Sequence, residues 1–493
     1  MIVLDRSQET PLYIQLYEAL KSEITSGAIE DGSKLPPIRT LADELDVSRN
    51  TVEMAYQQLT AEGYVTSRSG SRYRVENTNH TLHEPKDNMS KIRQTAGSTQ
   101  SALKQAGLLC GKTLQDECER SSEHQIEFDF AYGNRSEGSF PSRLWITLVS
   151  EALDYDQGAS SRYSDPFGEI ELRQIIAQNL NATRGVQCDP EQVIIQPGTQ
   201  EAVDALTVLF DASYDTVAIE NPGYDGVRRV FENRRFHLVP LDVASTPERF
   251  RESLEASNAT IAFITPSNQF PTGKILPLDD RLAILKWAAQ NGTYLLEDDY
   301  CREYRYVGNP IPSLQSLDTN GRVIYLGTLS KMLSPALRMS YIVLPHELLE
   351  VWQNVYSNYY CPVPWINQQA LLLFGKQGHW DRYVRKAFVT YRTRRNILID
   401  TLQATMGDRI QIIGGEAGLH VLVSTNDSRT QQELIQAAAE KGVGIYPTHQ
   451  YWMTPYEDRP HHLRESVLVG FSAIQEDQIS EGINRLKAAW FGA

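Results

Sequence analysis

One lysine in this 493-residue chain has neighbours that suit covalent chemistry. Lys331 follows the β-rich run RVIYLG, Ser330 stands directly before it, and Arg338 comes seven residues later. A lysine amine forms a Schiff base with a carbonyl group, and an arginine with nearby hydroxyl groups binds phosphate. A Ser-Lys pair on a turn is by itself usually only solvated, so the inference depends on the residues that accompany it.

Three other apolar runs end in residues of complementary chemistry. VIIQ leads to Gly198 and Thr199 at the start of an expected helix, where main-chain N–H groups can bind phosphate. TVAIE leads to Tyr224, which offers an aromatic face, and YLLE leads to Asp298 and Tyr300. With the lysine, these are the groups that pyridoxal phosphate (PLP) requires: an amine, an acid for the ring nitrogen, a stacking partner and a phosphate site.

The elements that must position these residues form an alternating pattern. From about residue 126 onward, β-rich runs alternate with helical stretches such as DDRLAILKWAAQNG. This alternation predicts an α/β fold with a mostly parallel sheet, and ligands of such sheets bind beyond the carboxyl ends of the strands. The polar residues fall at those ends.

Residues 126–493 resemble the fold-type I aminotransferases, which combine a large α/β domain with a smaller α+β domain. The resemblance implies that Lys331 forms the Schiff base with PLP and that Asp298 pairs with the pyridine nitrogen, with Asp299 as the alternative acid. It implies that Tyr300 reaches the ring hydroxyl and that Tyr224 stacks on the ring. The implied phosphate ligands are the amides of Gly198 and Thr199, the side chains of Thr328, Ser330 and Arg338, and Tyr163 acting on the partner subunit of a homodimer.

Two positions depart from the aminotransferase pattern. Phe270 stands before Pro-Thr-Gly, where those enzymes usually have Asn, so either Asn268 or Gln269 could replace its hydrogen bond. Leu468 stands three residues before Phe471, where many relatives have an arginine that binds the substrate carboxylate. We therefore expect no full turnover, although residual half-transamination stays open.

The N-terminal segment has the pattern of a winged helix-turn-helix. Apolar residues recur at helical spacing from Pro11 to Ile29, two further helices meet near Asp46, and Ser48 is a natural N-cap for the second. TSRSGSRYRV then predicts a hairpin. The expected DNA contacts are Ser48, Arg49, Asn50 and Thr51 on the recognition helix and Arg68 and Arg72 on the wing.

The overall charge of -15 argues against nucleic acid, but its distribution does not. Residues 48–74 hold four Arg against two Glu, so the expected recognition surface is positive. A small helical bundle that binds another protein is the alternative. LPPIR (35–39), VSRNTV (47–52) and LTAEGY (59–64) resemble the GntR family, and that resemblance adds Arg39 as a DNA contact.

The whole chain thus resembles the MocR-type (GabR-like) regulators, which implies a PLP-dependent regulator that binds a double-stranded DNA operator as a homodimer. We expect a DNA-binding domain at 1–76, a polar linker at 77–125 and an effector domain at 126–493. The effector domain is expected to sense PLP itself or an amine. An active aminotransferase with a DNA-binding appendage is the alternative, and a regulator with a purely structural cofactor is a third possibility.

The absence of an 18-residue apolar run and of a signal peptide predicts a cytoplasmic protein without membrane contact. The five scattered cysteines predict no metal site.

Overall fold

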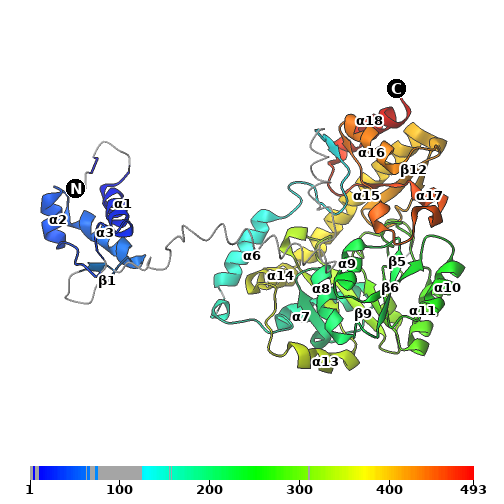
Figure 1. The fold of residues 1–493 in the computed structure, drawn as a ribbon, viewed down its shortest axis with the longest axis horizontal. Helices are drawn as coiled ribbons and strands as arrows, with labels where there is room; N and C mark the ends of the chain where they lie inside the picture. The colour runs from blue at the N-terminus through cyan, green and yellow to red at the C-terminus, as the bar shows by residue number, and fades with distance from the viewer. Residues whose placement is uncertain are drawn as a thin grey trace, which may run out of the picture. The chain divides into compact units, whose positions relative to one another are not determined.

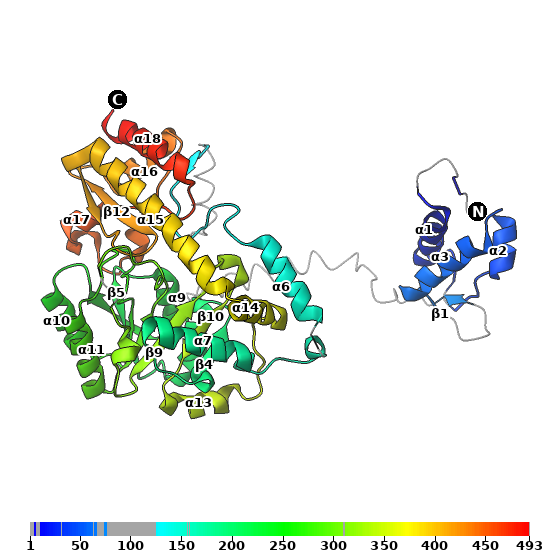
Figure 2. The same ribbon diagram turned by 180° about the vertical axis from the view of Figure 1, so that it is seen from behind.

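The computed structural model divides the chain into two compact units, residues 1–116 and 117–493. It describes residues 4–5, 10–30, 32–62, 64–66, 73–75, 125–154, 156, 158–308 and 311–492. Figures 1 and 2 show both units as ribbons. None of the helices in the described part of the chain is long and apolar enough to cross a membrane.

The N-terminal unit has the predicted helices. They are α1 (Leu12–Thr25), α2 (Ile38–Glu44) and α3 (Arg49–Ala61), and α1 packs against α3 around a buried apolar cluster. The turn between α2 and α3 contains Asp46 at a φ of +52°. Ser48 caps α3, because its Oγ accepts a hydrogen bond from the Thr51 N–H at 3.1 Å. The helix-turn-helix pattern is confirmed.

A short antiparallel pair follows α3. β1 (Val65–Thr66) pairs with β2 (Arg74–Val75), with Val65 opposite Val75. This pair is the base of the predicted hairpin. The predicted wing contacts Arg68 and Arg72 lie outside the described residues, as does nearly all of the predicted linker at 77–125.

A seven-stranded sheet forms the centre of the C-terminal unit, in the order β4-β10-β9-β8-β7-β5-β6. All neighbouring strands are parallel except that β10 runs antiparallel to both β4 and β9. The strands are β4 (Val193–Gln196), β5 (Thr216–Asn221), β6 (His237–Asp242), β7 (Ile261–Ile264), β8 (Tyr294–Asp298), β9 (Val323–Thr328) and β10 (Ser340–Val343). The predicted mostly parallel sheet is confirmed.

The predicted runs did not include β6, which lies at one edge of the sheet. Its side chains are mostly exposed or half-buried, and it contains Pro240. Proline cannot donate to a ladder of hydrogen bonds, so it is tolerated at a sheet edge. The weak apolar pattern of this strand follows from its edge position.

Helices cover both faces of this sheet, because its strands are apolar on both sides. α8 (Thr199–Leu206), α9 (Asp225–Asn233) and α13 (His346–Tyr356) share one apolar cluster with the strands. The other clusters involve α6 (Ser142–Asp154), α7 (Ile170–Arg184), α10 (Pro247–Ala256), α11 (Leu278–Asn291), α12 (Leu314–Leu317) and α14 (Trp365–Lys376). The predicted α/β layering is therefore observed.

A smaller α+β part lies above this sheet in Figure 1. It contains the antiparallel sheet β11-β12-β14, formed by β11 (Ile410–Ile413), β12 (His420–Thr425) and β14 (Val467–Gly470). The other elements are α15 (His379–Met406), α16 (Gln431–Glu440), α17 (His461–Arg464), α18 (Ile479–Phe491) and the parallel pair β3 (Phe128–Asp129) with β13 (Val443–Gly444). They share one buried apolar cluster with residues near Tyr300.

Candidate functional site

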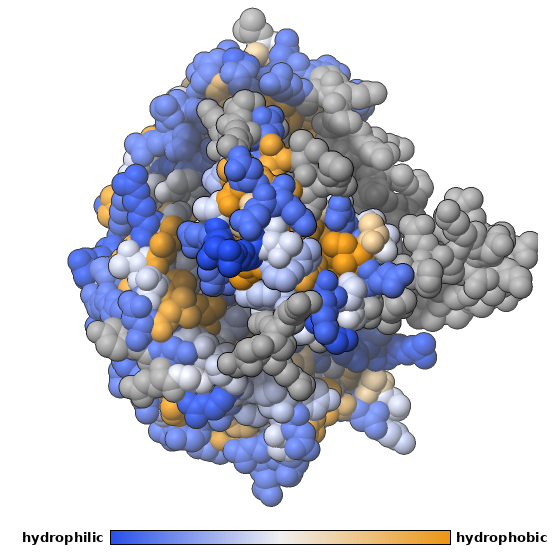
Figure 3. Space-filling model, turned by 90° about the vertical axis from the view of Figure 1, so that its left-hand side faces the viewer, coloured by the Kyte–Doolittle hydropathy of each residue, from blue (hydrophilic) through white to orange (hydrophobic). Residues whose placement is uncertain are grey.

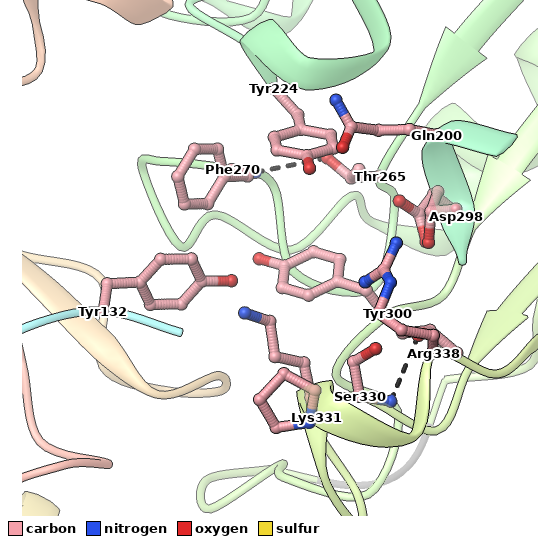
Figure 4. Close-up of a pocket in the computed structure, with 13 residues that line it drawn as sticks. Tyr132, Gln200, Tyr224, Thr265, Phe270, Asp298, Tyr300, Ser330, Lys331 and Arg338 are labelled. Atoms are coloured by element: carbon pink, nitrogen blue, oxygen red, sulfur yellow. Dashed lines mark hydrogen bonds between the residues drawn. The ribbon is translucent and has the colours of Figure 1, made fainter. Parts of the chain in front are cut away.

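A pocket lies where β5, β7, β8 and β9 of the large sheet end. Most of its lining comes from the loops after these strands and from the start of α8 (Figure 4). The lining residues are Tyr132, Thr199, Gln200, Tyr224, Thr265, Phe270, Asp298, Tyr300, Thr328, Ser330, Lys331, Pro335 and Arg338. The structure thus brings together eight of the ten predicted cofactor residues.

Lys331 is buried at the centre of this pocket. Its Nζ lies 4.4 Å from the centroid of the Tyr132 ring, and burial lowers the pKa of this amine. The Lys331 carbonyl accepts hydrogen bonds from Arg135 Nη1 at 2.7 Å and from the Tyr304 hydroxyl at 3.2 Å, which fix the backbone. A buried amine with a lowered pKa is a better nucleophile near neutral pH.

Asp298 and Asp299 are distinguished by their partners. Asp298 lines the pocket, and its Oδ1 has no hydrogen-bond partner among the described residues. Burial and then the neighbouring charges of Asp299 and Glu220 raise the pKa of Asp298 to about 8. Asp299 accepts hydrogen bonds from Arg184 Nε and the Tyr325 hydroxyl, both at 2.8 Å. Asp299 Oδ1 also has no partner among the described residues, but Asp299 does not line the pocket, so Asp298 is the acid placed to meet a cationic ring nitrogen.

Tyr300 is held by a residue that the sequence left ambiguous. Asn268 Nδ2 donates to the Tyr300 hydroxyl at 2.6 Å, while Asn268 Oδ1 has no partner among the described residues. The Gln269 amide instead donates to Glu220 Oε2 at 3.2 Å and to the Pro222 carbonyl at 2.9 Å. Asn268, rather than Gln269, lies beside Tyr300.

Aromatic side chains enclose the pocket. Tyr224 contacts Phe270 edge to face, with ring centroids 6.1 Å apart, and Tyr132 packs against Phe270 at 5.1 Å. Figure 4 shows the hydroxyls of Tyr132 and Tyr300 facing each other near the Lys331 amine. Sequence reasoning missed Tyr132, and its only signal was its place directly after the alternating stretch Phe-Asp-Phe-Ala at 128–131.

The expected phosphate end is only partly as predicted. Thr199 begins α8, Thr328 and Ser330 line the pocket, and the Ser330 N–H donates to Thr328 Oγ1 at 3.2 Å. The Gly198 N–H, however, donates to Ser340 Oγ at 3.1 Å and is not available to a phosphate. The prediction for the Gly198 amide is wrong, because the antiparallel strand β10 places Ser340 against it.

Glycine is still required at position 198, for a different reason. Its φ is +133°, and a Cβ there would overlap Arg338 Nη2. Arg338 forms an ion pair with Glu201 at 3.1 Å, and both side chains are about half exposed. Gly198 therefore lets the arginine lie against the start of α8.

Tyr163 and Leu468 do not line this pocket. Tyr163 is 79% exposed and stacks on Tyr360, with ring centroids 4.0 Å apart. Leu468 lies on β14, pairs with Leu422 and is fully buried in the apolar cluster of the smaller sheet. Lys331 and Arg338 are the cationic side chains among the described residues that line the pocket.

The N-terminal unit exposes the expected recognition residues. Arg39 on α2 and Ser48, Arg49 and Asn50 at the start of α3 are exposed, and Thr51 is half-buried. The Ser48 and Thr51 hydroxyls are 2.8 Å apart, so both belong to the cap of α3. Arg39, Arg49 and Asn50 thus have the freest side chains of this set.

Known proteins resemble both parts of the chain. Residues 12–75 match the bacterial regulatory proteins of the gntR family, and residues 134–486 match aminotransferase class I and II. The uncharacterised HTH-type regulator YdeL of Bacillus subtilis is 36% identical over 99% of this chain and 98% of its own. The probable rhizopine catabolism regulatory protein MocR of Rhizobium meliloti is 33% identical over 99% of this chain and 96% of its own. The chain belongs to the MocR-type regulators.

A solved aminotransferase structure resembles the larger part of the chain. An archaeal alanine:glyoxylate aminotransferase shares 25% identity with a TM-score of 0.69, over 78% of this chain and 96% of that one. The C-terminal unit of this MocR-type chain therefore has the aminotransferase fold, with the pocket at the carboxyl ends of its strands.

Proposed function

We propose that this protein is a PLP-dependent transcriptional regulator that binds DNA and senses a small molecule. Residues 1–76 form the DNA-binding domain, residues 77–125 the linker, and residues 126–493 the effector domain. The matches to the gntR and aminotransferase families support this division.

One observation carries the cofactor proposal. The buried Lys331 amine and the unpartnered Asp298 Oδ1 line the same pocket. An isolated buried carboxyl group is costly unless a cation or hydrogen-bond donor meets it, and a protonated pyridine ring is such a partner. PLP, when bound, supplies an aldehyde that condenses with primary amines. Lys331 provides the attacking nitrogen, and Asp298 keeps the ring nitrogen protonated.

The other pocket residues bind and orient the ring. Tyr300 donates its hydroxyl hydrogen to the ring oxygen and is held by Asn268, and Tyr224 packs on the ring. Thr199, Thr328, Ser330 and Arg338 bind the phosphate, because hydroxyl groups and a guanidinium suit a dianion.

The assembly is a homodimer, and the exposed aromatic surface of the C-terminal unit supports it. Tyr163 and Tyr360 stack while both are more than half exposed, and Ile146 on α6 is 68% exposed. Figure 3 shows apolar side chains among hydrophilic ones on one face of the molecule. Tyr163 reaches the cofactor phosphate of the partner subunit, and the operator contains two half-sites.

The signal is PLP itself or an amine rather than a simple α-amino acid. Leu468 is apolar and buried, so the arginine that usually binds a substrate carboxylate is missing at that position. The same residue argues against the alternative of an active aminotransferase, because turnover would require a cationic side chain that binds the substrate carboxylate. We therefore expect at most a half-reaction without turnover.

The test compares DNA binding by the apo and PLP-loaded protein. Fluorescence anisotropy with DNA from upstream of the protein's own gene should give different affinities for the two forms. Single-turnover mixing with amines and amino acids then separates regulator from enzyme. Equal DNA affinities together with multiple turnovers on a common amino acid would favour the aminotransferase instead.

A further inference from the structure

Four arginines line a second cavity, close in sequence to the cofactor residues but separate from the PLP pocket. Arg302 and Arg305 follow Tyr300 in the chain, and Arg184 and Arg281 come from α7 and α11. Ser267 and Glu303 also line this cavity, and none of these side chains lines the pocket around Lys331.

The arginines outnumber the carboxylates near them. Arg184 pairs with Asp299 at 2.8 Å, and Arg302 pairs with Glu303 at 2.8 Å. Arg281 donates to the main-chain carbonyls of Leu276, Pro312 and Pro266 at 2.7–3.0 Å. Within the described ranges, Arg281 and Arg305 form no ion pair.

Glu297 is the remaining acid close to this cluster. It accepts hydrogen bonds from the main-chain N–H groups of Leu314 and Gln315, at 2.8 and 2.9 Å. Even if Glu297 is counted as ionised with Asp299 and Glu303, four guanidinium groups face three carboxylates. The cavity is therefore cationic.

Two nitrogen atoms of the arginines that line the cavity lack acceptors among the described residues. Arg302 has a side chain only 7% exposed, and its Nε and Nη2 donate to Glu303 and Asn179, but its Nη1 has no partner in the described part of the chain. Arg305 Nε is likewise buried without a partner there. A buried donor that makes no hydrogen bond carries a large desolvation cost.

We propose that this cavity binds a small oxyanion, the phosphate or carboxylate group of a metabolite. Guanidinium groups donate to such oxygens in pairs, which would satisfy Arg302 Nη1 and Arg305 Nε together. Arg184 Nη2 donates to Ser267 Oγ at 3.0 Å, so the guanidinium of Arg184 and the hydroxyl of Ser267 lie together in the lining of this cavity. Glu303 does not repel the anion strongly, because Arg302 neutralises it.

The test uses the full chain loaded with PLP, so that the phosphate site near Arg338 is filled. Inorganic phosphate and succinate are titrated separately at constant ionic strength in chloride, with calorimetry and the melting temperature as readouts. We expect saturable binding of one of them with a dissociation constant below about 1 mM and a matching rise in melting temperature. Which anion binds distinguishes a phosphate ligand from a carboxylate ligand.

Matched variants locate the site. Arg305→Gln should weaken binding about tenfold or more, and Arg305→Lys, which keeps the charge but loses the planar donor pair, should weaken it less. Arg249→Gln on the exposed side of α10 should bind like the parent. The proposal is overturned if neither anion binds saturably, or if Arg305→Gln and Arg249→Gln bind alike.

Discussion

Asp298 and Asp299 are consecutive residues with different surroundings: Asp298 lines the pocket and forms no ion pair among the described residues, whereas Asp299 lies outside the pocket lining with its Oδ2 2.8 Å from Arg184 Nε. Burial raises the pKa of Asp298 to about 8, whereas the nearby Arg184 charge and the Tyr325 hydroxyl overcome burial and lower the pKa of Asp299. The chain thus keeps one carboxyl group for a ligand and uses the other for the fold.

The first prediction separates these two acids. Asp298→Asn should fold normally and bind PLP more weakly, because an amide cannot neutralise a protonated ring nitrogen. Asp299→Asn should lower the free energy of unfolding by about 3–5 kcal/mol, because it leaves Arg184 buried without its counter-charge. Denaturant unfolding and PLP titration measure the two effects, and a stability loss confined to Asp298→Asn would contradict the assignment.

The second prediction concerns the lysine. The parent protein loaded with PLP should absorb visible light, and Lys331→Ala should lose that band while its circular dichroism is unchanged. Lys286→Ala, at an exposed position on α11, is the matched control and should keep the band. If Lys331→Ala keeps the visible absorption band, Lys331 is not the residue that reacts with PLP.

The third prediction uses the lowered pKa of Lys331. Only the neutral amine attacks an aldehyde, so the rate of PLP binding should rise with pH and level off below the pKa of a solvated lysine. Stopped-flow absorbance from pH 6 to 10 measures this profile. A rate that still rises steeply at the highest pH would show that the amine is not buried in this way.

The fourth prediction concerns DNA. If the arginine contacts a base, Arg39→Ala and Arg49→Ala should each lose about 1–3 kcal/mol of discrimination between DNA sequences. If it contacts a phosphate, each substitution should reduce the slope of log K against log salt concentration by about one. Arg249→Ala in the C-terminal unit serves as the control. DNA affinity that does not depend on salt and is unchanged by Arg39→Ala and Arg49→Ala would favour the alternative that the N-terminal unit binds another protein.

The fifth prediction concerns stability in acid. His420 Nε2 donates to the Pro271 carbonyl at 2.7 Å, and burial lowers the pKa of this imidazole from 6.5 to about 4. Below pH 6.5 the unfolded chain binds a proton that the folded one does not, so stability is full above pH 6.5 and falls by up to about 3 kcal/mol as the pH approaches 4.

His420→Asn should flatten this part of the pH profile, measured by denaturant unfolding between pH 7 and 4.5. His237→Asn, at an exposed position on β6, should leave the profile unchanged. Identical slopes in the parent and His420→Asn would show that this histidine does not cause the acid sensitivity.

The sequence by itself determined the features that depend on local pattern. The strands and helices around Lys331, the break near Asp46 and the cap by Ser48 follow from apolar periodicity and from a hydroxyl side chain at a helix start. These are interactions between residues close in the chain, so their signals lie within short windows.

Only the tertiary structure decided which of several adjacent polar residues meets the pocket. Successive side chains of a strand point to opposite faces, so one residue of register separates Asp298 from Asp299, and loop geometry separates Asn268 from Gln269. The Gly198 N–H donates its hydrogen bond to Ser340, which is 142 residues away in sequence. The four arginines of the second cavity come from three separate segments between residues 184 and 305. Such contacts depend on how distant elements pack, and no local pattern records them.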